Sequence, residues 1–367
     1  MKEFTGFLRG INVGGWLTNY KRMGKLRPQW RHDLTPGDRK HFASYFSERD
    51  VTNIKDAFGV DHIRLCFDQV VIEDYQTGAY IEQHLRYIDD CLLWCERAGL
   101  RVILNLHHGF GAYCDIPDDT LFDEGNGQLR ARFVRLWEML DERYRDKPGV
   151  VFELLNEPAL EVADSKKWNA LAAETVAAIR KRGNTRVIMV GGVCWNLPCS
   201  LNDMLVCGDK RVVYTFHFYA PHIFTHQRTF TSELHHYYNC ALSYPSDDTS
   251  AYDAYLKFID PDRGDFDLFP RIDKAYLRAE MQPVLAWMAA HPDEILYLGE
   301  FGTISCADMA SRENWTRDVL SLCDEYGIPF CIWNYLSTPY DGNRFSLVDD
   351  YTRRPVSAKM AAMIRGK

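Results

Sequence analysis

The chain alternates short β-rich apolar runs with longer segments of helical periodicity, and it does so eight times. The helical segments include Ile81–Ala98, Leu129–Tyr144, Trp168–Arg180, Tyr276–Ala290 and Ala310–Tyr326. The β-rich runs are Phe7–Ile11, His62–Leu65, Val102–Leu106, Val151–Leu155, Val187–Val190, Val213–Phe218, Ile295–Leu298 and Phe330–Trp333. This order is typical of an α/β fold and predicts a single (β/α)8 TIM barrel. A doubly wound sheet shows the same local alternation, but the count of eight and the lack of a glycine-rich phosphate motif favour the barrel.

One interval is longer than the others. About 80 residues separate the sixth β-rich run from the seventh, and the excess, residues 222–271, is rich in His, Tyr, Phe, Asp and Pro. We therefore expect residues 1–367 to form one catalytic domain, with residues 222–271 as a subdomain inserted on the sixth βα loop. Because these loops build the catalytic face of a barrel, the insertion is expected to wall a cleft. The alternative is a decorative loop.

Charge and cysteine content indicate which binding partners and which cellular compartment suit this chain. The formal charge is −8 and no dense Lys/Arg run occurs, which argues against nucleic acid or an anionic membrane as a partner. The eleven cysteines are an odd number without CxxC spacing, as expected of reduced thiols in a cytoplasmic protein. No apolar stretch has the length of a signal peptide or a membrane span, so we expect a soluble protein. The oligomeric state is not readable.

Two carboxyls end strands that lie nearly opposite each other in such a barrel. The fourth run continues into Asn156-Glu157-Pro158, and the seventh ends in Gly299-Glu300-Phe301-Gly302, where the glycines permit close backbone approach. The carboxyl ends of barrel strands are where barrel enzymes react. Two carboxyls facing each other across a narrow mouth are what glycoside hydrolysis requires. We predict Glu157 and Glu300 as the catalytic pair.

Other polar and aromatic residues end the remaining strands. Arg64 is expected to hold Glu300 ionised, because a neighbouring positive charge lowers a carboxyl pKa. Imidazoles, a phenol and an indole face can bind sugar hydroxyls or stack on a sugar ring. The predicted substrate-binding set is Arg64, His107, His108, Asn156, His217, Tyr219 and Trp333, with His108 supporting the site rather than contacting the sugar. Glu153 lies deeper on the fourth strand than Glu157 and is expected to be a paired core carboxylate.

These motifs together resemble glycoside hydrolase family 5 in chain order and across nearly the whole sequence. They are Arg9–Trp16, His62–Leu65, Asn105–Gly109, Asn156–Pro158, His217–Tyr219, Gly299–Gly302 and Ile332–Tyr335. The resemblance is closest to a clostridial endoglucanase without a secretion signal, which shares the run Phe224–Gln227 and an insertion after the sixth strand. It implies a retaining cellulase-type enzyme with Glu157 as acid/base, Glu300 as nucleophile, a β-glucan substrate and no cofactor.

Several alternatives stay open at this point. Within the family these are an exo-acting β-glucosidase or β-1,3-glucanase and a β-mannanase. A metal-dependent hydrolase built on His107, His108, His217, His222 and His226 lacks a carboxylate cluster at metal spacing, so we expect no metal. A carbohydrate-binding barrel that has lost catalysis is disfavoured because both catalytic carboxyls are present.

Overall fold

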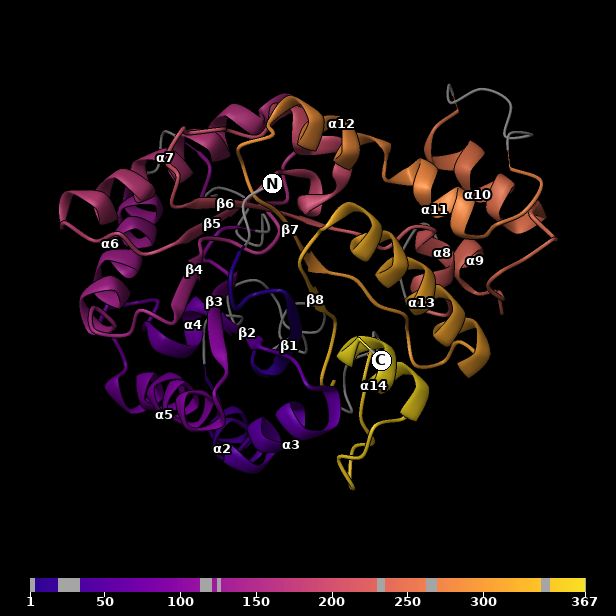
Figure 1. The fold of residues 1–367 in the computed structure, drawn as a ribbon. Coiled ribbons are helices and arrows are strands. Elements are labelled where there is room, and N and C mark those ends of the chain that lie inside the picture. Colours follow the sequence, from indigo (N-terminus) through magenta and orange to yellow (C-terminus); the bar gives the residue numbers. More distant parts are fainter. Residues whose placement is uncertain are drawn as a thin grey trace.

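A computed structural model describes residues 4–18, 34–112, 121–123, 127–229, 235–261, 269–337 and 344–366. Eight strands form a closed barrel in which each strand pairs in parallel with the next and β8 pairs with β1 (Figure 1). The strands are β1 Arg9–Leu17, β2 His62–Asp68, β3 Arg101–His108, β4 Val150–Glu153, β5 Ile188–Gly191, β6 Val212–His217, β7 Leu296–Glu300 and β8 Phe330–Ile332. The predicted TIM barrel is confirmed.

Helices surround the barrel and cover the outer face of its strands (Figure 1). Those between β1 and β6 are α2 Pro36–Ser44, α3 Glu48–Phe58, α4 Gln69–Ile72, α5 Glu82–Ala98, α6 Gly127–Arg143 and α7 Ser165–Lys181. Those after β6 are α8 His222–Thr225, α9 His235–Tyr238, α10 Ser250–Ile259, α11 Lys274–Glu280, α12 Gln282–Ala290, α13 Met309–Tyr326 and α14 Ala358–Arg365. Because helices cover one face and packed side chains fill the barrel, β2, β4, β5, β6, β7 and β8 are buried along their whole length.

The helical expectations need two corrections. The single helix expected over Tyr276–Ala290 is two helices, α11 and α12, because Pro283 sits in the first turn of α12 and disrupts a continuous helix. The fifth strand is not followed by an α-helix. Every residue between β5 and β6 is described, and this stretch holds two 3₁₀ helices, η3 Cys194–Asn196 and η4 Pro198–Asp203, with α12 packed beside η4.

The bottom of the barrel is closed by aromatic side chains. Phe4 and Phe7 stack with ring centroids 4.5 Å apart and belong to a buried cluster that includes Tyr297. His62 lies between the carboxyl of Asp61 and the hydroxyl of Tyr297, at 2.5 Å from each. Packed side chains therefore close the amino-terminal end of the barrel. The catalytic residues of a barrel enzyme are expected at the opposite end, where the carboxyl ends of the strands lie.

The segment between β6 and α11 gathers to one side of the barrel, where α8, α9 and α10 lie beside α11 and α13 (Figure 1). Residues 230–234 and 262–268 of the expected insertion lie outside the described residues. Tyr244 joins this segment to α13 through two hydrogen bonds: its backbone N–H donates to Ser311 Oγ at 2.9 Å, and its hydroxyl donates to Asp318 Oδ2 at 2.9 Å. The segment is thus packed against the barrel's own helices.

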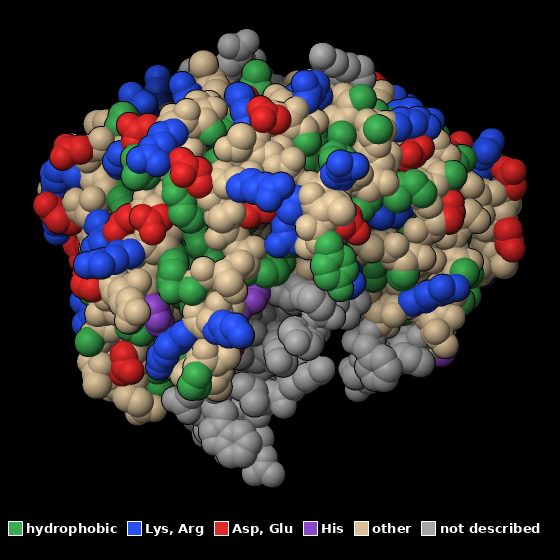
Figure 2. All heavy atoms as spheres, turned by 90° about the horizontal axis from the view of Figure 1, so that it is seen from below, with side chains coloured by type: hydrophobic (Ala, Val, Ile, Leu, Met, Phe, Trp, Pro, Cys, Tyr) green, Lys and Arg blue, Asp and Glu red, His purple; other side chains and the backbone are tan. Residues whose placement is uncertain are grey.

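Acidic and basic side chains are interspersed over the face drawn in Figure 2 and do not separate by sign there. Among the helices in the described ranges, none has the length and apolar character needed to cross a membrane.

Candidate active site

Glu157 is delivered by an extension of β4 beyond its last ladder residue. The backbone N–H of Asn156 donates to Leu106 O at 2.9 Å, which continues the pairing with β3 up to the catalytic face. Asn156 is buried, whereas 22% of the Glu157 side chain is exposed. The chain therefore holds Asn156 within the wall and presents the next side chain at the rim.

Glu300 is the last residue of β7, and its side chain is 5% exposed. The ladder between β6 and β7 shifts register so that His217 lies opposite Glu300. A Cβ on Gly299 would lie 2.7 Å from Thr215 Oγ1 and 3.2 Å from His217 Nε2, so only glycine allows this close approach. The expectation that glycines flanking Glu300 serve close packing is confirmed at this position.

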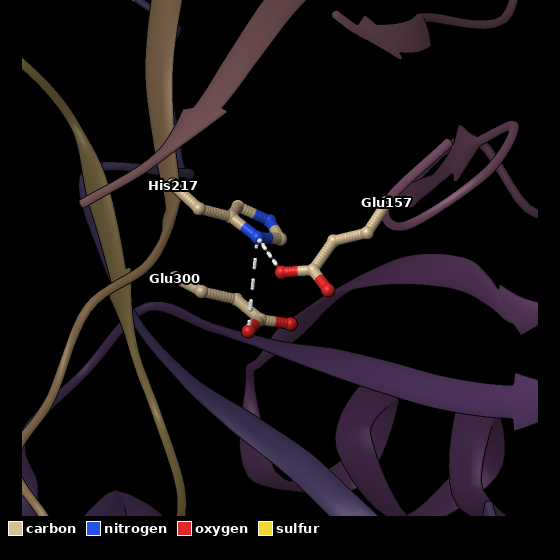
Figure 3. A group of neighbouring side chains, drawn as sticks. All are labelled: Glu157, His217 and Glu300. Atoms are coloured by element: carbon tan, nitrogen blue, oxygen red, sulfur yellow. Dashed lines mark hydrogen bonds and ion pairs between the residues drawn. The ribbon is translucent and has the colours of Figure 1, made fainter. Parts of the chain in front are cut away.

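His217 stands between the two carboxyls (Figure 3). Its Nδ1 lies 2.7 Å from Glu157 Oε1 and 3.8 Å from Glu300 Oε2. One atom from each of the three side chains lies within 4.8 Å of the others. The two carboxyls are therefore near enough to act on the same glycosidic bond, as the paired carboxyls of glycosidases do.

Arg64 is the centre of a buried network beneath the carboxyls. Its Nε donates to Glu153 Oε2 at 2.6 Å, and its Nη2 donates to Glu153 Oε1 at 2.9 Å. Its Nη1 donates to Glu300 Oε1 at 2.6 Å and to Asn12 Oδ1 at 2.8 Å, and its Nη2 also donates to Asn156 Oδ1 at 2.7 Å. Glu153 is therefore the paired core carboxylate that the sequence predicted. A single guanidinium fixes the orientation of Glu300 and of Asn156.

The two catalytic candidates differ in their hydrogen bonds. Tyr219 Oη donates to Glu300 Oε2 at 2.9 Å, so Glu300 accepts from a phenol and from a guanidinium. Burial and the neighbouring Glu300 keep the pKa of Tyr219 well above its usual value, so the phenol remains a donor. Glu157 has only His217 within hydrogen-bonding distance among the described side chains. The surroundings of Glu300 therefore suit a carboxylate.

Burial raises the pKa of Glu157 to about 7, although the charges of Arg64 and His108 oppose the rise. Burial also raises the pKa of Glu300, against His217 and Arg64, which lower it. The expected contact between Arg64 and Glu300 is present and lowers the pKa of Glu300 as expected, but burial outweighs the guanidinium, so the net shift is upward. Burial lowers the pKa of His217 to about 4, so this imidazole is neutral near pH 7.

The other predicted residues gather on the same side of the barrel. The His107 and Trp333 rings stack with centroids 5.4 Å apart and an interplanar angle of 7°. His107 Nδ1 lies 3.1 Å from Asn105 Oδ1, and His108 Nδ1 lies 2.6 Å from Asp68 Oδ1. Trp333 is 7% exposed, with one neighbour of its indole being the stacked ring of His107.

A metal ion would need three or more ligands in one place. Among the described residues, the only group of three potential ligands is Glu157, His217 and Glu300. Of the five histidines in the metal-hydrolase alternative, this group holds His217 alone, and its Nδ1 already faces Glu157. These groups are better suited to sharing a proton between the neutral imidazole of His217 and the carboxyl of Glu157, whose pKa is raised.

Trp195 is a further residue of interest that the sequence did not single out. It lies in η3, is 46% exposed, and has a left-handed backbone, as do its neighbours Cys194 and Asn196 (φ 52°, 54° and 59° for residues 194–196). Its N–H donates to Pro158 O at 3.4 Å, so it adjoins the residues that follow Glu157. Such strain is concentrated at functional sites. In the sequence, Trp195 is recognisable only as a tryptophan shortly after a strand end. Tryptophans at such positions are common in protein cores, so this one did not stand out.

A closed parallel barrel that carries facing carboxyls at the ends of β4 and β7 defines a (β/α)8 glycosidase. The family profile for cellulase (glycosyl hydrolase family 5) matches residues 32–338, and the chain belongs to that family.

Relatives across the whole length support this assignment. The chain is 34% identical over 365 residues to endoglucanase C of Acetivibrio thermocellus, covering 98% of both chains. It is 28% identical over 332 residues to cellodextrinase A of Ruminococcus flavefaciens, covering 89% of this chain and 85% of the relative. A solved hyperthermophilic endo-β-1,4-glucanase, 22% identical, shares the fold with a TM-score of 0.74 over 99% of this chain and 97% of that one.

Proposed function

We propose that this chain is a β-1,4-glucanase of the endo-acting cellulase type, in which Glu300 is the nucleophile and Glu157 the acid/base. The observation that carries the proposal is the asymmetry of the carboxyl pair. Glu300 accepts hydrogen bonds from Arg64 and Tyr219, whereas Glu157 has a pKa of about 7 and lies against a neutral imidazole. Retention of configuration is general for the family.

In the first step, a Glu300 oxygen attacks the anomeric carbon while the bond from that carbon to the leaving oxygen breaks. Glu157 gives its proton to the leaving oxygen, and a glycosyl ester of Glu300 forms. In the second step, Glu157 takes a proton from water, the water oxygen attacks the same carbon, and the ester bond breaks. Each step inverts the anomeric configuration, so the product retains it.

The surrounding residues take supporting roles in this proposal. Arg64 and Tyr219 hold the nucleophile in place, and His217 orients Glu157. Asn156 uses its Oδ1 to accept from Arg64, which directs its Nδ2 to the sugar 2-hydroxyl. His107 and Trp333 contribute sugar contacts, and His108, fixed by Asp68, tunes the charge near Glu157. Trp195, exposed and tied through its backbone to Pro158, offers an indole for stacking on a sugar near Glu157.

Removal of the nucleophile tests the assignment. Glu300→Gly should abolish hydrolysis of an activated aryl β-cellobioside, and azide should restore cleavage with an α-glycosyl azide as product, because azide attacks from the vacated face. Rescue that gives the β-azide would assign the acid/base role to Glu300 instead. Products from cellotetraose, laminaritetraose, mixed-linkage glucan and mannotetraose then test linkage and sugar preference. Release of single glucose units from one chain end would replace the endo assignment with an exo one.

We also propose that residues 222–271 are an inserted subdomain of the catalytic domain and that the protein works in a reducing compartment such as the cytoplasm. In the described parts of the insertion, Tyr238, Tyr252 and Tyr255 are buried and belong to the same hydrophobic core as the barrel residues. The ten cysteines in the described ranges are all free, and Cys199 and Cys306 are exposed. Thiol titration of protein isolated without reductant should find all eleven thiols, and a disulfide would contradict the compartment.

A further inference from the structure

Hydrogen bonds fix the first turn of the inserted segment to the loop that follows Glu300. The backbone N–H of Ile304, four residues after Glu300, donates to Thr225 O at 2.9 Å. Cys306 Sγ donates to Gln227 O at 3.3 Å. Trp315 Nε1 donates to Ala220 O at 2.9 Å and holds the start of the segment. Helix α8 therefore has a defined place at the catalytic face.

Two histidines of this turn, His222 and His226, lie near Tyr219, whose phenol donates a hydrogen bond to Glu300. The rings of His222 and His226 stack with centroids 3.9 Å apart and an angle of 13°. His226 packs edge-to-face on Tyr219 at 4.9 Å and lies against Phe345 at 5.0 Å. Since Tyr219 donates to Glu300, a single side chain separates His226 from Glu300.

Both imidazoles use the same ring nitrogen for protein contacts. His222 Nδ1 contacts the hydroxyl of Tyr238, and His226 Nδ1 lies 3.0 Å from Thr225 Oγ1. Neither Nε2 has a partner within the described chain, and both side chains are partly exposed. The two stacked rings are thus held through Nδ1, and each keeps its Nε2 available for a ligand.

These Nε2 atoms are uncharged hydrogen-bonding groups near pH 7. Burial lowers the pKa of His222 to about 4, and burial together with the adjacent His222 keeps the pKa of His226 well below its usual value. A neutral imidazole nitrogen donates or accepts according to its tautomer, which matches a sugar hydroxyl. A metal ion fits less well, because no third ligand joins the pair among the described residues and zinc sites take at least three protein ligands.

We propose that His222 and His226 form a sugar subsite next to the ring that Glu300 attacks, through which the inserted segment binds β-glucan. This inference rests on the proposed function. Each Nε2 hydrogen-bonds a hydroxyl of the adjoining sugar, while Tyr219 and Phe345 support His226 from behind. The pair therefore sets the preference for longer oligosaccharides.

Phenylalanine variants test the subsite because they keep an aromatic ring in the stack and remove Nε2, together with the Nδ1 contact to Tyr238 or Thr225. His222→Phe and His226→Phe should each lower kcat/KM on cellotetraose about fivefold to tenfold more than on an aryl β-glucoside, mainly through KM, since each loses one hydrogen bond to the longer substrate, whereas the lost Nδ1 contact affects both substrates alike. In the Glu300→Ala background, calorimetric titration should show a Kd for cellotetraose weaker by about the same factor. Tyr252→Phe, a buried change on the same segment, should leave both substrates unaffected.

Equal losses on cellotetraose and the aryl glucoside would show a structural effect through Tyr219 and overturn the subsite. An unchanged Kd for cellotetraose in both variants would overturn it as well. These outcomes are separate from failure of the proposed function, which would appear as a wild-type enzyme that cleaves no β-glucan.

Discussion

Protonation of Glu157 should set the alkaline limit of activity. The pKa rises from 4.5 to about 7, a change of about 2.5 units, and each unit corresponds to about 1.36 kcal/mol. The protein thus favours the protonated form by about 3 kcal/mol relative to a glutamate in water. At pH 7 about half of the Glu157 side chains carry the proton, compared with about one in 300 for an ordinary glutamate.

The assay is the pH dependence of kcat/KM in the free enzyme. On cellotetraose, kcat/KM should fall about tenfold per pH unit above about pH 7, because the leaving alcohol needs the proton. Glu157→Gln should remove this limb and lower kcat/KM at pH 6 by about 10²–10⁴. An aryl β-cellobioside with a good leaving group needs no proton in the first step and should lose far less, with azide present to accept the glycosyl group.

Glu161→Gln is the matched control, since Glu161 is exposed and lies on the same loop. It should leave the pH profile unchanged. An alkaline limb that persists in Glu157→Gln, or equal losses on both substrates, would refute the acid role.

Three further changes have definite expected outcomes. Gly299→Ala should destabilise the fold by about 1–3 kcal/mol in urea unfolding and reduce kcat, because the added Cβ meets Thr215 Oγ1 at 2.7 Å. Trp195→Ala should raise KM for cellotetraose about threefold to tenfold through lost stacking, with little change for short aryl glucosides. Burial raises the pKa of Glu157, so the folded state binds more protons than the unfolded state between about pH 4.5 and 7, and stability falls as pH rises through that window. Glu157→Gln should therefore raise Tm at pH 8 by an amount worth roughly 1–3 kcal/mol and change it little at pH 4, as measured by thermal unfolding.

The predictions about the fold that were wrong concern segments in which tertiary contacts override the local sequence pattern. Apolar periodicity extended a helix through Pro283, although the ring interrupts the hydrogen bonds at that point. The absence of a fifth α-helix was also missed, because η4 and α12 together fill the space that such a helix would occupy. Arg64 contacts Glu300 and lowers its pKa as predicted, but the sequence did not show that burial outweighs this effect. The contact follows from strand position, whereas the net pKa depends on how much water the whole site excludes.

Local order along the chain was sufficient to predict the barrel and the two candidate catalytic carboxyls. Eight strands of parallel character can close only with their carboxyl ends on one face, so Glu157 and Glu300 at the ends of β4 and β7 had to face each other. Burial, distance and partner choice were decided only in three dimensions. Three features depend on residues that are far apart in the sequence or separated by turns whose geometry the sequence did not predict. They are the pKa of Glu157, the hydrogen bonds of Arg64 to both Glu153 and Glu300, and the contact of His226 with Tyr219. The physical reason is that desolvation and hydrogen-bond geometry depend on every group packed around a side chain, while sequence pattern records only which face of an element that side chain occupies.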